Sequence, residues 1–127
     1  MHLPKDLLYH AEHTWARFEE DVATVGITDH AQKELGDIVY LELPEVGRRV
    51  AFGAVFGTVE SSKSVSELYS PVTGEVLAVN GELEDSPERI NDDPYGDGWM
   101  LRVRLIPGFD PAQLLDPEAY AARVGPN

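Results

Sequence analysis

The alternation of hydrophobic and polar residues along this chain constrains its fold more than any other feature of the sequence. Short runs rich in β-branched and aromatic residues are separated by turn sequences with Pro, Gly or acidic residues. The runs are 22–27, 38–43, 50–59, 65–69, 75–79 and 99–105, and the turn sequences are 19–21, 44–47, 71–74 and 92–98. Many short strands with such corners predict a mainly β fold with short helices, a sandwich or flattened barrel.

Three short helices are expected outside the β core, each from local capping signals. They cover residues 28–35, a turn that starts at Asp110-Pro111, and residues 116–124. An Asp before a Pro at the first helical position is a common helix start. Gly36 is free to adopt the left-handed conformation that often ends a helix.

Length and composition indicate one globular domain. The 127 residues predict a single domain, with a core over about 13–105 and a helical tail over about 110–124. The absence of cysteine excludes disulfides, thiolate zinc sites and cysteine nucleophiles. Residues 1–12 have no apolar stretch long enough for a signal peptide, and the run 50–59 is too short to span a membrane. We therefore expect a cytoplasmic protein.

The charge is strongly acidic. Ten Lys and Arg residues stand against 23 Asp and Glu residues, a formal net charge of −13. Such a surface repels phosphate backbones and anionic lipid headgroups, so neither nucleic acid nor a membrane surface is an expected partner. Acidity favours encounters with basic patches on protein partners, and it serves equally well as a simple solubility device.

The segment 57–71 is the most unusual part of the sequence, because two β-rich runs flank small polar residues and one lysine. That residue, Lys63, is one of three lysines in the chain. A tight hairpin would hold it in a fixed register while small neighbours leave room for a modifying enzyme. The residues expected to face a ligase are Glu60, Ser61, Ser62, Ser64 and Glu67. The alternative is an ordinary solvated lysine on a loop.

Several short segments together form an ordered pattern. They are His13-Thr14-Trp15, 25–32, 35–39, 43–47, 59–64, 70–76, Asn80 and 91–99. In their order and spacing they resemble the H proteins of the glycine cleavage system, which are lipoylated carriers. The resemblance runs from about residue 13 to residue 99.

The resemblance implies lipoic acid bound covalently to Lys63, within a motif that the family usually writes Glu-Ser-Val-Lys-Ala. Here Ser62 and Ser64 replace the valine and alanine, and both are small enough for ligase access. Thr14 stands where the family commonly has glutamate, with Glu12 two residues earlier. The resemblance also places His30 near the cleft where the loaded arm rests.

The resemblance further implies a carrier of one-carbon metabolism and no catalytic side chain, so the chain is not expected to be an enzyme. A pyridoxal-phosphate glycine decarboxylase (P protein) would load the aminomethyl group of glycine onto the arm. A tetrahydrofolate-dependent aminomethyltransferase (T protein) would remove it, and dihydrolipoyl dehydrogenase (L protein) would reoxidise the arm. A lipoate ligase or lipoyl transferase would attach it.

Two other interpretations of Lys63 stay open. One is a lipoyl or biotinyl carrier domain of another multienzyme complex, although biotinyl sites usually have methionine on both sides of the lysine. Dehydrogenase lipoyl sites usually have aspartate before it, where this chain has Ser62. The other is an unmodified acidic adaptor that kept the fold without the arm.

Other kinds of site find little support in the sequence. The spacings of His10, His13 and His30 fit no compact zinc pattern. A calcium loop that begins at Asp93 fails, because its twelfth position is Arg104 in place of glutamate. No P-loop, dinucleotide glycine motif or Ser-His-acid order is present.

Overall fold

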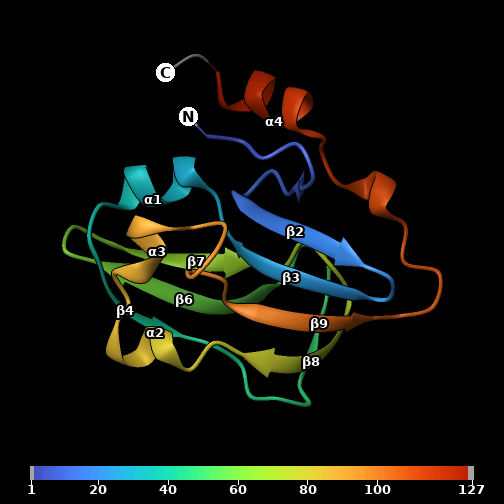
Figure 1. The fold of residues 1–127 in the computed structure, drawn as a ribbon, viewed down its shortest axis with the longest axis horizontal. Coiled ribbons are helices and arrows are strands. Elements are labelled where there is room, and N and C mark those ends of the chain that lie inside the picture. The colour runs from blue at the N-terminus through green and yellow to red at the C-terminus, as the bar shows by residue number, and fades with distance from the viewer. Residues whose placement is uncertain (1, 126–127) are drawn as a thin grey trace.

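The computed structural model describes residues 2–125 as two antiparallel sheets with short helices around them (Figure 1). The larger sheet has six strands in the order β1-β2-β3-β9-β8-β5, and the smaller has three in the order β4-β6-β7. The strands are β1 (Leu8–Tyr9), β2 (Thr14–Glu19), β3 (Val22–Ile27), β4 (Ile38–Glu42), β5 (Arg49–Val50), β6 (Val55–Ser61), β7 (Val65–Tyr69), β8 (Gly74–Val79) and β9 (Leu101–Leu105). The expected mainly β fold is confirmed, as two sheets and not as a closed barrel.

The main hydrophobic core joins the two sheets. Val25, Val76 and Val103 of the larger sheet and Val59 and Leu68 of the smaller one are almost fully buried in the same cluster. Each such side chain stabilises the fold by about 1.5–3 kcal/mol relative to an exposed one. A strand that slipped by one residue would turn its buried side chains outward, so burial fixes the register.

Two expectations for the strands differ from the structure. The run 50–59 is divided into β5 and β6, because residues 51–54 form a turn in which Gly53 has a φ of +79°. Strand β2 was not predicted, because Thr14, Trp15 and Ala16 are all buried and show no alternation. Trp15 and Ala16 belong to different hydrophobic clusters, so both faces of β2 are covered.

The helices lie around the sheets and are short. They are α1 (Asp29–Leu35), α2 (Glu82–Asp85), α3 (Arg89–Asp92), the 3-10 helix η1 (Pro111–Gln113) and α4 (Pro117–Val124). Side chains of Thr28, Asp110 and Asp116 cap α1, η1 and α4, as the sequence predicted. Helices α2 and α3 were not predicted, because each has only four residues and no side-chain cap.

A second cluster of buried residues lies beyond β2. It consists of Leu7, Tyr9, Trp15, Tyr95 and Tyr120. The rings of Tyr9 and Tyr120 stack with centroids 4.9 Å apart, so α4 is packed against the N-terminal segment, and both lie at the top of Figure 1. Gly26 makes room for this cluster, since a Cβ there would come within 2.7 Å of the Trp15 ring. The assignment of the whole chain to one domain stays a prediction.

Candidate functional site: the Lys63 hairpin

Lys63 is exposed in the turn that joins β6 to β7, and this hairpin end lies at the left of Figure 1 beside α1. The strands pair up to Glu60 and Val65, and the N–H of Ser61 donates to the carbonyl of Ser64 over 2.8 Å. The predicted hairpin is therefore confirmed. Lys63 lies at its tip, beyond the last paired residues.

The Ser61 hydroxyl holds this turn in shape. Its Oγ accepts hydrogen bonds from the N–H of Lys63 and from the N–H of Ser64, each over 3.1 Å. Serine can stabilise a turn in this way because its short side chain reaches back to nearby backbone groups. The tip is ordered by a side chain, which explains why it needs no Asn-Gly sequence.

The segment between α1 and β4 supports the hairpin tip from the side. The N–H of Ser62 donates to the carbonyl of Asp37 over 3.0 Å. The aliphatic part of Lys63 lies against Gly36, where a Cβ would come 2.8 Å from Lys63 Cε. The sequence predicts Gly36 only as a helix end, because its contact with Lys63 depends on the tertiary structure.

Asn91 at the end of α3 fixes the segment that supports the tip. Its side-chain oxygen accepts from the N–H of Ile38 over 2.9 Å, and its amide nitrogen donates to the carbonyl of Gly36 over 2.9 Å. The same nitrogen also donates to Gln32 in α1 over 3.1 Å. Asn91 thus connects α1, α3 and β4 behind the hairpin. No local pattern predicts these contacts, because the partners are more than 50 residues apart.

The surroundings of Lys63 are acidic. The five residues expected to face a ligase all lie on this hairpin: Glu60, Ser61 and Ser62 before Lys63, and Ser64 and Glu67 after it. Asp37, which the sequence analysis missed, adds a further exposed carboxylate beside the tip. The structure thus places the expected residues around Lys63. Their role toward a ligase stays a prediction.

Comparison with known proteins gives one consistent family. A model described as "Glycine cleavage H-protein" matches residues 7–126. The glycine cleavage system H protein of Rubrobacter xylanophilus is 62% identical over 122 residues, covering 96% of this chain and 94% of that protein. The "Probable glycine cleavage system H protein" of Natronomonas pharaonis is 54% identical over 122 residues, covering 96% of each chain.

A solved structure shows the same fold. The crystal structure of a glycine cleavage system H protein from Mycobacterium marinum superposes with a TM-score of 0.90 at 38% identity, covering 98% of this chain and 100% of that one. This chain belongs to the glycine cleavage H-protein family. The resemblance noted in the sequence is therefore confirmed over nearly the whole chain, including the tail after residue 99.

Thr14, a departure from the usual H-protein sequence, has a structural role here. Its side chain is buried, and its hydroxyl donates to the carbonyl of Tyr69 at the end of β7 over 2.8 Å. Thr14 therefore connects the larger sheet to the strand that follows Lys63. Glu12, the nearest carboxylate before it, is exposed.

His30 lies near the start of α1, at the opposite end of the helix from Gly36. Its half-buried ring is 4.8 Å from the ring of His13, and its Nε2 is 3.6 Å from a carboxylate oxygen of Glu34. Burial, together with the nearby His30, lowers the pKa of His13 below its usual value of 6.5. His13 Nδ1 lies 2.7 Å from the Tyr120 hydroxyl, so this pair connects α4 to the residue just before β2.

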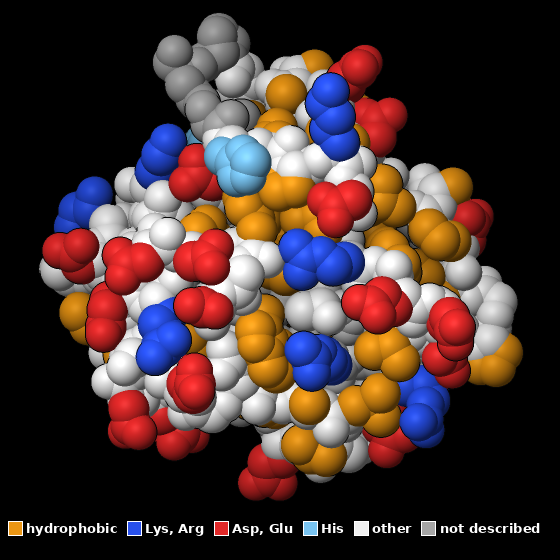
Figure 2. All heavy atoms as spheres, in the orientation of Figure 1, with side chains coloured by type: hydrophobic (Ala, Val, Ile, Leu, Met, Phe, Trp, Pro, Cys, Tyr) orange, Lys and Arg blue, Asp and Glu red, His pale blue; other side chains and the backbone are white. Residues whose placement is uncertain are grey.

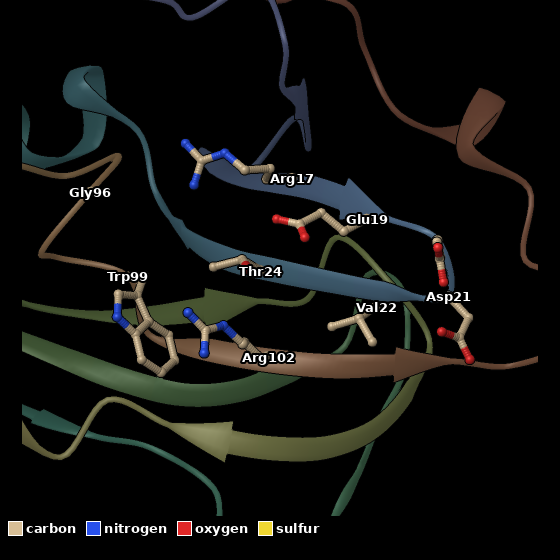
Figure 3. A pocket seen from close by; sticks show the side chains of 9 residues that line it. Arg17, Glu19, Asp21, Val22, Thr24, Gly96, Trp99 and Arg102 are labelled. Carbon is tan, nitrogen blue, oxygen red and sulfur yellow. The ribbon is translucent and has the colours of Figure 1, made fainter.

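A wide depression lies on the outer face of β2, β3 and β9, on the other sheet from Lys63 (Figure 3). Its volume is about 910 Å³, and Arg17 and Arg102 flank Thr24 within it. The guanidinium of Arg17 donates to the carbonyl of Tyr95 over 3.0 Å, and that of Arg102 stacks on Trp99 at 4.5 Å. Basic and acidic side chains are mixed on this face (Figure 2). The face is therefore neither uniformly positive nor uniformly negative, and its charge does not select one kind of ligand.

Two further observations concern residues 2–125. Within this range no three His, Cys, Asp or Glu side chains are arranged to hold a metal ion. No helix of the described chain has the length and apolar character to cross a membrane. The cytoplasmic location stays a prediction.

Proposed function

We propose that this chain is the lipoylated carrier of a glycine cleavage system, with the lipoyl group on Lys63, and that it is not an enzyme. The observation that carries the proposal is the geometry of Lys63. Its side chain is exposed at the tip of a paired hairpin, and Ser61 and Asp37 hold the backbone of that tip in place. A carrier needs this combination of a fixed attachment point and a free arm.

The other lysines lack these features. Lys33 lies on α1, and its Nζ is 3.2 Å from a carboxylate oxygen of Asp29. Lys5 is exposed in a turn before β1, without a paired hairpin around it. Lys63 is the lysine that a ligase can approach at the end of two strands, with a serine on each side of it in the sequence.

The residues of this chain would tether and present the group. When bound, a lipoyl disulfide supplies a sulfur that accepts the aminomethyl group of glycine together with two electrons. The chain offers a single attachment tip to the decarboxylase, the aminomethyltransferase, the dihydrolipoyl dehydrogenase and the ligase or lipoyl transferase. Tethering raises the effective concentration of the group at each docked enzyme. The acidic surface favours partners with basic patches.

Intact mass spectrometry tests the attachment site. The purified chain is incubated with a lipoate–protein ligase, ATP and lipoic acid, and peptide analysis locates the addition. We expect one lipoyl group per chain on Lys63, none on Lys63→Arg, and normal addition on the matched control Lys33→Arg. Modification of Lys63→Arg would overturn the assignment, and so would modification with biotin by a biotin ligase under the same conditions.

We also propose that His30 lies near the resting position of the loaded arm. The support is that His30 is half-buried next to His13 and Glu34, on the helix whose other end is followed by Gly36, which contacts Lys63. His30→Ala should speed hydrolysis of the loaded arm, whereas His10→Ala, before β2, should leave the rate unchanged. An equal lifetime of the loaded arm in His30→Ala and in the unsubstituted chain would contradict the proposed place of His30.

A further inference from the structure

Large hydrophobic side chains are exposed mainly on the smaller sheet. Among residues 2–125, the exposed ones are Val39, Tyr40, Val46, Val55 and Val65. Four of them lie in β4, β6 or β7, and Val46 lies in the segment after β4. Exposed apolar groups that gather in one place often mark a protein interaction site.

Two of these residues form a row next to Lys63. Tyr40 in β4 pairs with Glu60 in β6, and Glu60 pairs with Val65 in β7. We call Tyr40, Glu60 and Val65 the tip row, since it is the row nearest the turn that joins all three strands. Tyr40 and Val65 are 50% and 65% exposed, whereas Leu41, next to Tyr40, and Val59, next to Glu60, are buried in the core.

Val39 extends the apolar part of this surface. The pairing of β4 with β6 is irregular between Ile38 and Tyr40, so Val39 sits at a β-bulge and is 54% exposed. Bulges re-aim side chains and protect the edges of sheets. Here Val39 and Tyr40 are both exposed, although they are adjacent in a strand.

Carboxylates lie directly behind the tip row. The next row on the same face pairs Glu42 with Thr58 and Thr58 with Glu67. We call Glu42, Thr58 and Glu67 the acidic row. A partner that covers both rows would need apolar groups opposite Tyr40 and Val65, with a basic group opposite Glu60 between them. It would also need basic side chains opposite Glu42 and Glu67.

We propose that the tip row and Val39 form the docking surface for the enzyme that acylates Lys63, with the acidic row as its charged rim. This inference rests on the proposed function and adds residues of β4 to it. The identity of the partner follows from how closely it must approach Lys63. Lys63 Nζ lies close to Gly36, 3.4 Å from the position that a Cβ would take there, so an acylating enzyme must bring its reacting carbon down to the protein surface. Enzymes that act on the far end of an attached arm do not need to bring their reacting groups to Lys63 Nζ itself.

The acyl-transfer step explains why this close approach is needed. The Lys63 ammonium loses one proton, and the amine attacks the carbonyl carbon of an acyl adenylate. A C–N bond forms, the bond from that carbon to the phosphate oxygen breaks, and AMP leaves with the electron pair. A second proton leaves the nitrogen as the amide forms. Every bond that changes lies at Lys63 Nζ, beside the tip row.

The test is the kinetics of lipoylation by a lipoate–protein ligase with ATP and lipoic acid, followed by intact mass. The variants are Tyr40→Thr and Val65→Thr, which place a β-branched residue suited to a strand at each position, with Val46→Thr as the matched control at 63% exposure. We expect kcat/KM to fall about tenfold for Tyr40→Thr and about threefold for Val65→Thr, mainly through KM. Val46→Thr should match the unsubstituted chain.

The acidic row gives an independent measurement. Salt should lower kcat/KM for the unsubstituted chain, because it screens attraction between Glu42 or Glu67 and a basic rim. Glu42→Gln and Glu67→Gln should weaken this dependence, whereas Glu118→Gln on α4 should leave it unchanged. Equal salt dependence in all these variants would count against the charged rim.

The outcomes separate this inference from the proposed function. If the unsubstituted chain receives no lipoyl group, both proposals fail. If Lys63 is lipoylated but Tyr40→Thr and Val65→Thr react at the unsubstituted rate, the docking surface alone is wrong. An equal loss of rate in Val46→Thr would also overturn it, because the effect would not belong to the tip row.

Discussion

Gly36 and Lys63 are in contact, and the contact depends on the missing side chain of the glycine. A Cβ at position 36 would come 2.8 Å from Lys63 Cε, and the φ of Gly36 is +79°. This conformation is one that residues with a Cβ rarely adopt. Gly36 thus both ends α1 and leaves space for the lysine that we propose as the attachment point.

Gly36→Ala should destabilise the fold and displace the Lys63 side chain. We expect the free energy of unfolding to fall by about 1–3 kcal/mol from backbone strain, whereas the flexible end of the exposed Lys63 side chain can move aside at little cost. Gly53→Ala is the control, since Gly53 has the same φ of +79° and nothing within 4 Å of its Cβ position. Urea unfolding should therefore show similar losses for both variants, and a much larger loss in Gly36→Ala would show that Lys63 cannot move aside.

Ser61→Ala should loosen the turn that holds Lys63. Its Oγ accepts from two backbone N–H groups, and removing it should cost about 1 kcal/mol of stability. Hydrogen exchange of the Lys63 and Ser64 amides should become faster, while exchange in β3 stays unchanged. Ser66→Ala, at an exposed position of β7, is the control. Unchanged exchange at Ser64 in Ser61→Ala would contradict the role of this hydroxyl.

Tyr120→Phe should destabilise the attachment of α4. The Tyr120 hydroxyl lies 2.7 Å from His13 Nδ1 and 2.9 Å from Thr28 Oγ1, and burial raises its pKa to about 12. Removing the hydroxyl leaves buried partners unsatisfied, so we expect a loss of about 1–3 kcal/mol in thermal or urea unfolding. Tyr40→Phe, on the exposed face of β4, should change stability by less than about 0.5 kcal/mol. Equal effects of the two variants would exclude this hydrogen-bonded group as a source of stability.

Stability should decrease as the pH falls through 6.5, because His13 is held neutral. Burial and the nearby His30 lower its pKa in the folded state below its usual value of 6.5. The unfolded chain therefore binds more protons between these two pKa values, and the free energy of unfolding rises with pH there. The contribution of His13 to the free energy of unfolding is present above pH 6.5. It is lost as the pH falls toward the lowered pKa of His13 in the folded state.

His13→Asn is the variant that tests this pH dependence. His13 has a φ of +74°, a conformation that asparagine tolerates well. The variant should show a smaller change in unfolding free energy between pH 8 and pH 5.5, whatever its stability at pH 8. Burial also lowers the pKa of His10, so part of the dependence should remain. An unchanged pH dependence in His13→Asn would contradict a half-buried His13 that is held neutral.

The elements that sequence predicted well are those whose signals are local. Thr28 caps α1 and Asp116 caps α4 through contacts three residues away, and the alternation in β3 reports a strand with one face in the core. Strand β2 was missed because Trp15 and Ala16 are buried on opposite faces, which removes the alternation. Helices α2 and α3 were missed because four residues give no helical period.

The sequence alone determined the β-rich class, the family resemblance and the hairpin with Lys63, because these depend on residue order and short-range turn chemistry. Only the tertiary structure decided what lies beside Lys63. Gly36, Asp37 and Asn91 come from two distant segments, and Tyr40 reaches the tip through pairing of β4 with β6. Contacts of this kind form when burial of the common core brings separate strands together, and no local pattern encodes which segments will meet.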